Sequence, residues 1–304
     1  MDLPLLPILF AVFVAGALAL DLGLLRRRGD HQVRPREALA WTALWVTLAL
    51  AFGAVVWFSR GAESALAYLT AYLVEWSLSL DNVFVIALIF SSFAIPPRLQ
   101  HRALVFGVLG ALVMRLGLIF AGVALVERFD WLLPLFGAFL LVTAVRMVRE
   151  DEAGEPAEHG FMSFLRRRLP LSPELHGEAF TIRQAGRRLL TPLGLALLSI
   201  EAMDLVFAVD SIPAVLAISS DSFVIYTSNA FAILGLRSLY FLLAEAREQF
   251  SLLKYGLAAT LAFIGVKLVA GGLFHLHLPT ALNLGAVVLF IGGSIALSLL
   301  RARR

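Results

Sequence analysis

Two stretches of this chain place acidic side chains within an otherwise apolar sequence. Each stretch holds two acids six residues apart, and a small polar residue follows the second acid at once. They are Glu75, Asp81 and Asn82 in the first stretch, and Asp204, Asp210 and Ser211 in the second. Acids inside membrane segments are energetically unfavourable and usually mark an ion or proton path. Two matching sets predict one ion site built from two related halves.

The chemistry of these donors predicts a hard cation. Carboxylate, amide and hydroxyl oxygens are the ligands that Mg²⁺, Ca²⁺ and Mn²⁺ prefer. The chain has no cysteine, and its six histidines lie outside the apolar spans or at their edges, so a zinc or copper site in the core is not expected. Glu201 is a further candidate ligand. Met203 could add one thioether and favour Mn²⁺, although methionine more often fills packing gaps.

The spacing of the acids limits how they can meet. On an unbroken helix, six residues correspond to about 9 Å of rise and about 120° of rotation, which is too far apart for one small ion. Either the four acids meet across two helices, or each helix is broken between its two acids. Pro213 favours a break in the second stretch, because it cannot donate to the carbonyl of Val209. A break would free carbonyls near residues 77–80 and 206–209 as further ligands.

Ion pairing is the structural alternative for the acids. The core positions of the apolar spans hold five acids and four bases, so the charges could largely neutralise one another. The acids are Glu75, Asp81, Glu201, Asp204 and Asp210, and the bases are Arg115, Arg146, Arg237 and Lys267. Arg115 lies near the middle of its span and must have an acidic or carbonyl partner. We interpret Arg115, Arg237 and Lys267 as counter-ions or gates rather than ligands.

The elements that position these residues are predicted to be membrane helices. The 304 residues are 60% hydrophobic and 15% charged, whereas soluble domains carry about 25% charged residues. We expect an all-α, polytopic membrane protein that forms a single transmembrane domain over residues 1–304. Stretches of roughly 20 apolar residues, enough to cross the bilayer core, occur nine times. They are residues 3–25, 39–58, 66–90, 103–126, 131–148, 191–218, 222–243, 253–272 and 280–300.

The basic residues predict the orientation of these helices. The loops after helices 1, 3, 5 and 7, together with the C-terminus, hold 19 of the 25 lysines and arginines, and the opposite loops hold only Arg60 and Arg128. Basic loops stay in the cytoplasm. We therefore expect the plasma (inner) membrane, with the N-terminus outside and the C-terminus in the cytoplasm. The cytoplasmic loop 149–190 is interpreted as a linker, and residues 161–168 could form a short amphipathic piece on the lipid headgroups. Thr191 and Pro192 are suited to begin the next helix.

The similarity between the halves extends beyond the acidic stretches. Arg115 in helix 4 matches Arg237 in helix 7, so helices 3–5 (about 66–148) correspond to helices 6–8 (about 191–272). A shift by three spans reverses the direction of each helix, which makes the repeat inverted. Inverted repeats of this kind are typical of secondary transporters.

Several of these motifs resemble the TerC family of integral membrane proteins, named for tellurium resistance. The resemblance covers nearly the whole chain and is most specific in residues 75–85 (Glu-x-Ser-Leu-Ser-Leu-Asp-Asn-Val-Phe-Val) and 200–218 (Ile-Glu-Ala-Met-Asp-Leu-Val-Phe-Ala-Val-Asp-Ser-Ile-Pro-Ala-Val-Leu-Ala-Ile). Residues 20–23, 171–180 and 191–193 match as well. The resemblance implies manganese export and relief of manganese toxicity.

Two classes of function stay open at the level of sequence. The first is a secondary transporter that exports a divalent cation, Mn²⁺ before Ca²⁺ or Mg²⁺, from the cytoplasm on an H⁺ or Na⁺ gradient. The alternative is a non-transporting sensor or assembly factor that acts through loop 149–190. An enzyme is not expected, because the chain has no nucleotide-binding motif and no nucleophile–base set. No permanent cofactor or nucleic acid is expected, membrane lipids are the expected surroundings, and the oligomeric state is open.

Overall fold

The computed structural model describes residues 5–27, 35–129, 131–149, 170–184, 186–243, 252–274 and 279–302, and these form nine helices and one hairpin. The helices occur where the apolar pattern predicts them. In order they are α1 (Leu5–Arg27), α2 (Pro35–Arg60), α3 (Ala62–Ser92), α4 (Pro97–Arg128), α5 (Leu132–Arg149), α7 (Pro192–Leu216), α8 (Ser222–Leu243), α9 (Leu253–Phe274) and a last helix made of α10 (Thr280–Val287), the π-helical turn η2 (Val288–Gly292) and α11 (Gly293–Ala302).

Most of these helices are suited to a membrane. Seven of those in the described part of the chain are long and apolar enough to cross one, and α1 adds a shorter apolar run, Leu6–Ala19. α8 is not among the seven, because Ser228, Asn229 and Arg237 lower its hydropathy, yet neighbouring helices bury all three. The prediction of an all-α, polytopic membrane protein is confirmed.

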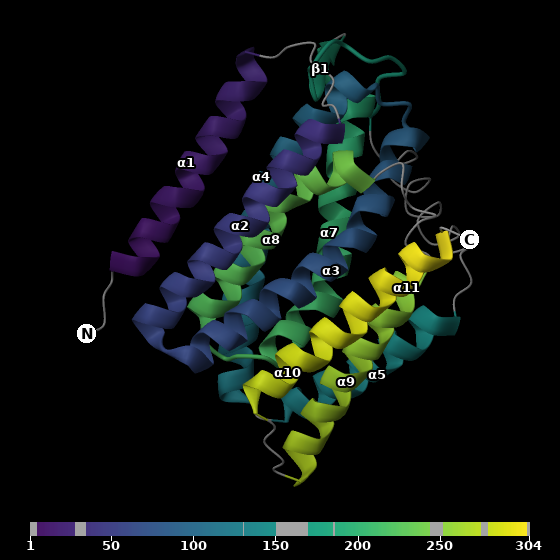
Figure 1. Ribbon diagram of the computed structural model, residues 1–304. Helices are drawn as coiled ribbons and strands as arrows, with labels where there is room; N and C mark the ends of the chain where they lie inside the picture. The colour runs from purple at the N-terminus through teal and green to yellow at the C-terminus, as the bar shows by residue number, and fades with distance from the viewer. Residues whose placement is uncertain are drawn as a thin grey trace.

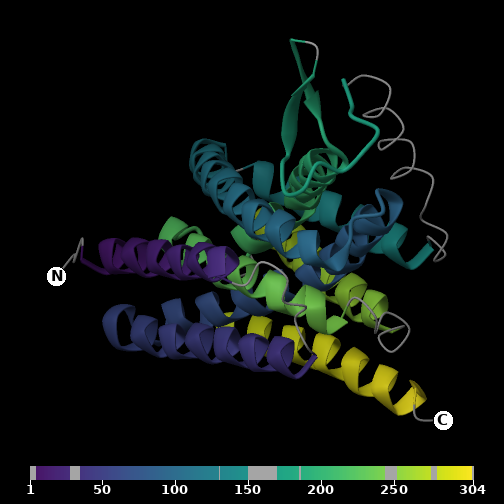
Figure 2. The same cartoon turned by 90° about the horizontal axis from the view of Figure 1, so that it is seen from above.

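The helices pack in pairs around the centre of the bundle (Figure 1). α3 runs parallel to α8, since Tyr68 contacts Phe231 and, further along both helices, Phe90 contacts Tyr240. α4 runs parallel to α7, where Gly107 lies against Ile200. α5 packs along α9, and the last helix lies beside α9 on the same side of the bundle (Figures 1 and 2).

This pairing bears on the predicted repeat. In the predicted repeat, α3 corresponds to α7, α4 to α8 and α5 to α9. The contact between α3 and α8 then corresponds to the contact between α7 and α4, and the contact between α5 and α9 corresponds to itself. An inverted repeat requires this arrangement, and the repeat itself stays a prediction.

Of the two alternatives for how the acids meet, the broken helix is wrong. α3 continues without interruption for 31 residues, and α7 continues for 25 residues through Pro213. Pro213 lies one turn before α7 ends at Leu216, where a missing backbone hydrogen bond disturbs only the helix end. The backbone around residues 77–80 and 206–209 is therefore helical and supplies no ligand through a break. The acids can meet only across different helices.

The segment between α5 and α7 contains a hairpin that the sequence did not predict. β1 (Thr181–Gln184) pairs antiparallel with β2 (Arg187–Leu190), and Gly186 has a positive φ of 77° in the turn. α7 follows directly, and its start is confirmed, because Thr191 Oγ1 accepts from the Gly194 N–H at 3.1 Å and Pro192 occupies the first turn. The predicted amphipathic piece, residues 161–168, lies outside the described residues.

Two ion pairs connect loops that the sequence analysis places on the same side. Arg60 at the end of α2 pairs with Asp221 before α8 at 2.5 Å. Arg102 in α4 pairs with Glu178, and its guanidinium lies 5.4 Å from the centre of the Phe180 ring. The alternation of loops deduced from the basic residues agrees with both contacts.

The α5–α9 contact depends on two glycines. A Cβ atom at Gly137 would lie 2.7 Å from the carbonyl oxygen of Gly265. Gly137→Ala should therefore destabilise the protein by about 1–3 kcal/mol through overpacking, seen as a lower midpoint of thermal unfolding in detergent. Gly117→Ala is the matched control, because no atom lies within 4 Å of that position. Equal midpoints for the two variants would contradict this packing.

Candidate functional site: a buried arginine and an adjoining cavity

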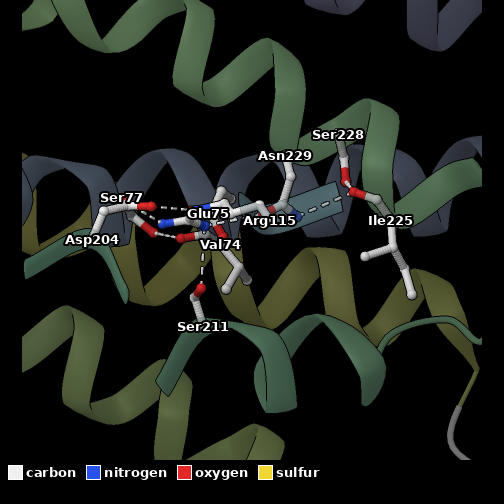
Figure 3. Close-up of polar contacts among 9 residues, drawn as sticks. All are labelled: Val74, Glu75, Ser77, Arg115, Asp204, Ser211, Ile225, Ser228 and Asn229. Atoms are coloured by element: carbon white, nitrogen blue, oxygen red, sulfur yellow. Dashed lines mark hydrogen bonds and ion pairs between the residues drawn. The ribbon is translucent and has the colours of Figure 1, made fainter. Parts of the chain in front are cut away.

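Arg115 lies where α3, α4, α7 and α8 meet, and its side chain is only 1% exposed (Figure 3). Its Nη1 atom pairs with Glu75 Oε1 of α3. On the other side, Nη2 and Nε donate to the two carboxylate oxygens of Asp204 in α7, at 2.9 and 3.3 Å. One guanidinium thus joins acids from both predicted halves of the chain.

Two neutral side chains complete the surroundings of the guanidinium. Nη1 also donates to Ser211 Oγ at 3.2 Å and to Asn229 Oδ1 at 3.1 Å. Asn229 is held in turn, because its Nδ2 atom donates to the carbonyl of Ile225 at 3.1 Å. We call Glu75, Arg115, Asp204, Ser211 and Asn229 the arginine cluster.

Local sequence explains how these side chains meet. Glu201, Asp204 and Ser211 follow one another at spacings of three and seven residues, which places them on one face of α7. α4 can approach this face because it presents Gly107 and Gly110 there. A Cβ atom at Gly110 would collide with the Glu201 carboxylate.

The arginine cluster carries a formal charge of −1, one guanidinium between two carboxylates. Charges taken out of water need partners, and removing one partner of a buried pair is strongly destabilising. Glu75 is fully buried, and its Oε2 atom has no hydrogen-bond partner among the described residues. The arrangement therefore has one unused acceptor and one excess negative charge.

A small cavity of about 20 Å³ adjoins the arginine cluster between the same four helices. A volume of this size holds about one water molecule or one bare ion. Most of its lining is apolar, and the polar groups that reach it come from Asn82 of α3 and Asp204 of α7. Met203 also lines the cavity. Asp204 therefore belongs both to the arginine cluster and to the cavity.

The other predicted ligands whose side chains the structure describes do not line the cavity. Glu201 is half-buried against Gly110 of α4. Asp210 faces α5, where Thr143 Oγ1 donates to it at 3.4 Å, so it lies apart from Ser211 and the arginine cluster. The side chain of Asp81 lies outside the description, although its neighbour Asn82 reaches the cavity. Within the described side chains, no three His, Cys, Asp or Glu residues form a metal-binding group.

The predicted counter-ions occupy three different places. Arg115 lies in the cluster, Arg237 is buried in α8, and Lys267 Nζ donates to the carbonyl of Ala217 at 3.2 Å, beyond the end of α7. The sequence analysis missed Asn229 and Thr143. An amide in the middle of an apolar helix was a signal that could have identified Asn229.

The profile of the integral membrane protein TerC family matches residues 60–304, which include every residue of the arginine cluster. The chain belongs to the TerC family. A membrane protein of Myxococcus xanthus, STKORF319, is 47% identical to it over 295 residues, 97% of this chain and 92% of the relative. The "Putative membrane-bound redox modulator Alx" of Escherichia coli K12 is 48% identical over 288 residues, 91% of this chain and 89% of the relative. No solved structure matches the chain.

The first prediction from the site concerns Arg115. Arg115→Ala should reduce stability by about 3–5 kcal/mol, because it leaves two buried acids without their cation. Thermal unfolding in detergent and the yield of folded protein measure this loss. Arg60→Ala is the matched control, since the Arg60–Asp221 pair is about one-third exposed and exposed pairs contribute at most about 1 kcal/mol. A variant Arg115→Ala as stable as Arg60→Ala would show that the buried pairing does not hold the helices together.

Proposed function

We propose that this TerC family member is a secondary transporter that exports a divalent metal cation, Mn²⁺ in the first place, from the cytoplasm. The observation that supports it most is the position of Asp204, which lines a small cavity and carries part of an excess negative charge. A cation that enters this cavity gains a carboxylate and an amide ligand away from water, as transporters require near the middle of the membrane.

The donors favour Mn²⁺ over its competitors. Mg²⁺ gives up its water shell reluctantly, which does not suit a cavity with room for about one water molecule. Carboxylate and amide oxygens suit Mn²⁺, and Met203 beside them is the feature by which we place Mn²⁺ before Ca²⁺. Asp81, Glu201, Asp210 and Ser211 stay predicted ligands for other stages of the path.

The architecture supports a transport cycle. The parallel pairs α3–α8 and α4–α7 enclose the cavity, and an inverted repeat of this kind lets one pair move against the other around a central site. The chain has no nucleotide-binding motif, so we propose that an H⁺ or Na⁺ gradient, rather than nucleotide hydrolysis, supplies the energy for export.

The name of the Escherichia coli relative points to a redox role for that protein. This chain has no cysteine, so it offers no thiol for redox chemistry of its own. We propose that a redox effect in this protein would arise through the metal that it moves.

We further propose that the protein lies in the inner membrane with its N-terminus outside. Because the chain has no cysteine, single introduced cysteines report the side directly. Glu63→Cys and Ser220→Cys should react with a membrane-impermeant maleimide in intact cells, since both are exposed at the end of the bundle with few basic residues. Glu174→Cys, also exposed, should react only in inverted vesicles. Labelling of all three from one side would contradict this topology.

Transport is tested by metal uptake into inverted vesicles with Mn²⁺, Ca²⁺, Mg²⁺ and Zn²⁺ compared. Wild-type protein should accumulate Mn²⁺ most rapidly. Asn82→Ala should reduce Mn²⁺ uptake by about tenfold or more while the protein still folds, because it removes a neutral ligand and leaves no buried charge unpaired.

Asn283→Ala is the matched control, because Asn283 is equally buried but lies in α10, outside the cavity lining. It should retain uptake. Wild-type vesicles that accumulate none of the four metals would contradict the transporter and favour the alternative function, a sensor or assembly factor. Uptake by Asn82→Ala at the wild-type rate would contradict the cavity as the site.

A further inference from the structure

We propose that the Arg115 guanidinium competes with the metal for the carboxylate of Asp204. Arg115 pairs with Asp204 when no metal is bound, and it releases this carboxylate when the metal binds. The inference rests on the proposed function and specifies how the same site selects and releases its cargo. It assigns to Arg115 a role in affinity and specificity, in addition to holding the helices together.

Asp204 both pairs with Arg115 and lines the cavity. Both of its carboxylate oxygens accept hydrogen bonds from Arg115, at 2.9 and 3.3 Å, and the same side chain lines the cavity. A metal ion on Asp204 would lie next to the buried guanidinium, where the low dielectric constant makes like charges repel strongly. Arg115 and the metal therefore compete for one carboxylate.

Arg115 keeps other hydrogen-bond acceptors when it releases Asp204. Glu75, Ser211 and Asn229 accept from its Nη1 atom, and none of the three lines the cavity. Glu75 Oε2 is buried and unused, so it can accept the N–H groups that Asp204 releases. The guanidinium can shift toward Glu75 without becoming an unpaired buried charge.

The same competition bears on selectivity. Arg115 stays in the cluster when it moves toward Glu75, so an entering cation meets a cluster whose formal charge is −1. Coulomb attraction is proportional to the charge of the ion, so a divalent ion gains about twice the attraction of Na⁺ or K⁺. Separating Arg115 from Asp204 costs the same for either ion, and a divalent ion therefore displaces Arg115 more readily than a monovalent ion. The return of Arg115 to Asp204 promotes release of the metal on the other side.

The test compares purified wild type, Arg115→Gln and Arg115→Lys, with Arg60→Gln as the control for loss of an arginine far from the cavity. Mn²⁺ binding is measured by titration calorimetry, with and without excess Na⁺, and thermal unfolding is measured with and without Mn²⁺. Arg115→Gln is prepared in Mn²⁺, because its acids lack their cation. Transport is measured on the same preparations.

Arg115→Gln should bind Mn²⁺ with a Kd lower by about tenfold or more, and Na⁺ should weaken this binding more than in wild type. Mn²⁺ should raise its unfolding midpoint by more than that of wild type, whereas its transport should fall because release slows. Arg115→Lys, which keeps the charge but cannot form the two-pronged contact with Asp204, should bind with intermediate affinity. Arg60→Gln should match wild type in every measurement.

The outcomes separate the inference from the proposed function. Wild-type protein that binds no Mn²⁺ would contradict the proposed function itself. If wild type binds Mn²⁺ but Arg115→Lys and Arg115→Gln bind it no more tightly, the competition is wrong and Arg115 is only structural. If Arg115→Gln does not fold even in Mn²⁺, the affinity of Arg115→Lys decides between the same two results.

Discussion

The structure depends on one buried guanidinium and the acids that hold it. Arg115 is almost completely shielded from water and lies between acids of α3 and α7, with Asn229 of α8 as a further acceptor. Leaving any of these charges unpaired in a region without water would cost several kcal/mol. The four central helices are therefore constrained to one mutual arrangement, and that arrangement also forms the cavity.

Small residues make this arrangement sterically possible. In a membrane the hydrophobic effect does not drive helices together, so close packing and polar contacts must do so. Gly107 and Gly110 let α4 approach the face of α7 that carries Glu201 and Asp204. Gly137 and Gly265 have the same function between α5 and α9, where each glycine lies against the carbonyl of the other. The charged centre and the glycine contacts thus support each other.

The sequence was sufficient to predict the helices and their order, because apolar runs of membrane length are a strong signal, and Thr191 with Pro192 marks the start of α7. It did not show which acids meet. Asp204 and Asp210 are six residues apart on one continuous helix, so they face different neighbours, Arg115 and Thr143. Only the packing of α4 and α5 determines those neighbours. Pro213 suggested a break, yet it lies only one turn before the end of α7, where it does not interrupt the helix. The hairpin before α7 has strands of only four residues, which gave only a weak signal in the sequence.

The central claim is that a divalent cation binds in the cavity beside Asp204 and takes this carboxylate from Arg115. Anomalous X-ray scattering at the manganese edge, from crystals of the full chain grown with Mn²⁺, tests it most directly. We expect a manganese peak in contact with Asp204 and Asn82, with Arg115 shifted toward Glu75. A peak at another site, with Arg115 still bound to both oxygens of Asp204, would contradict metal binding in this cavity.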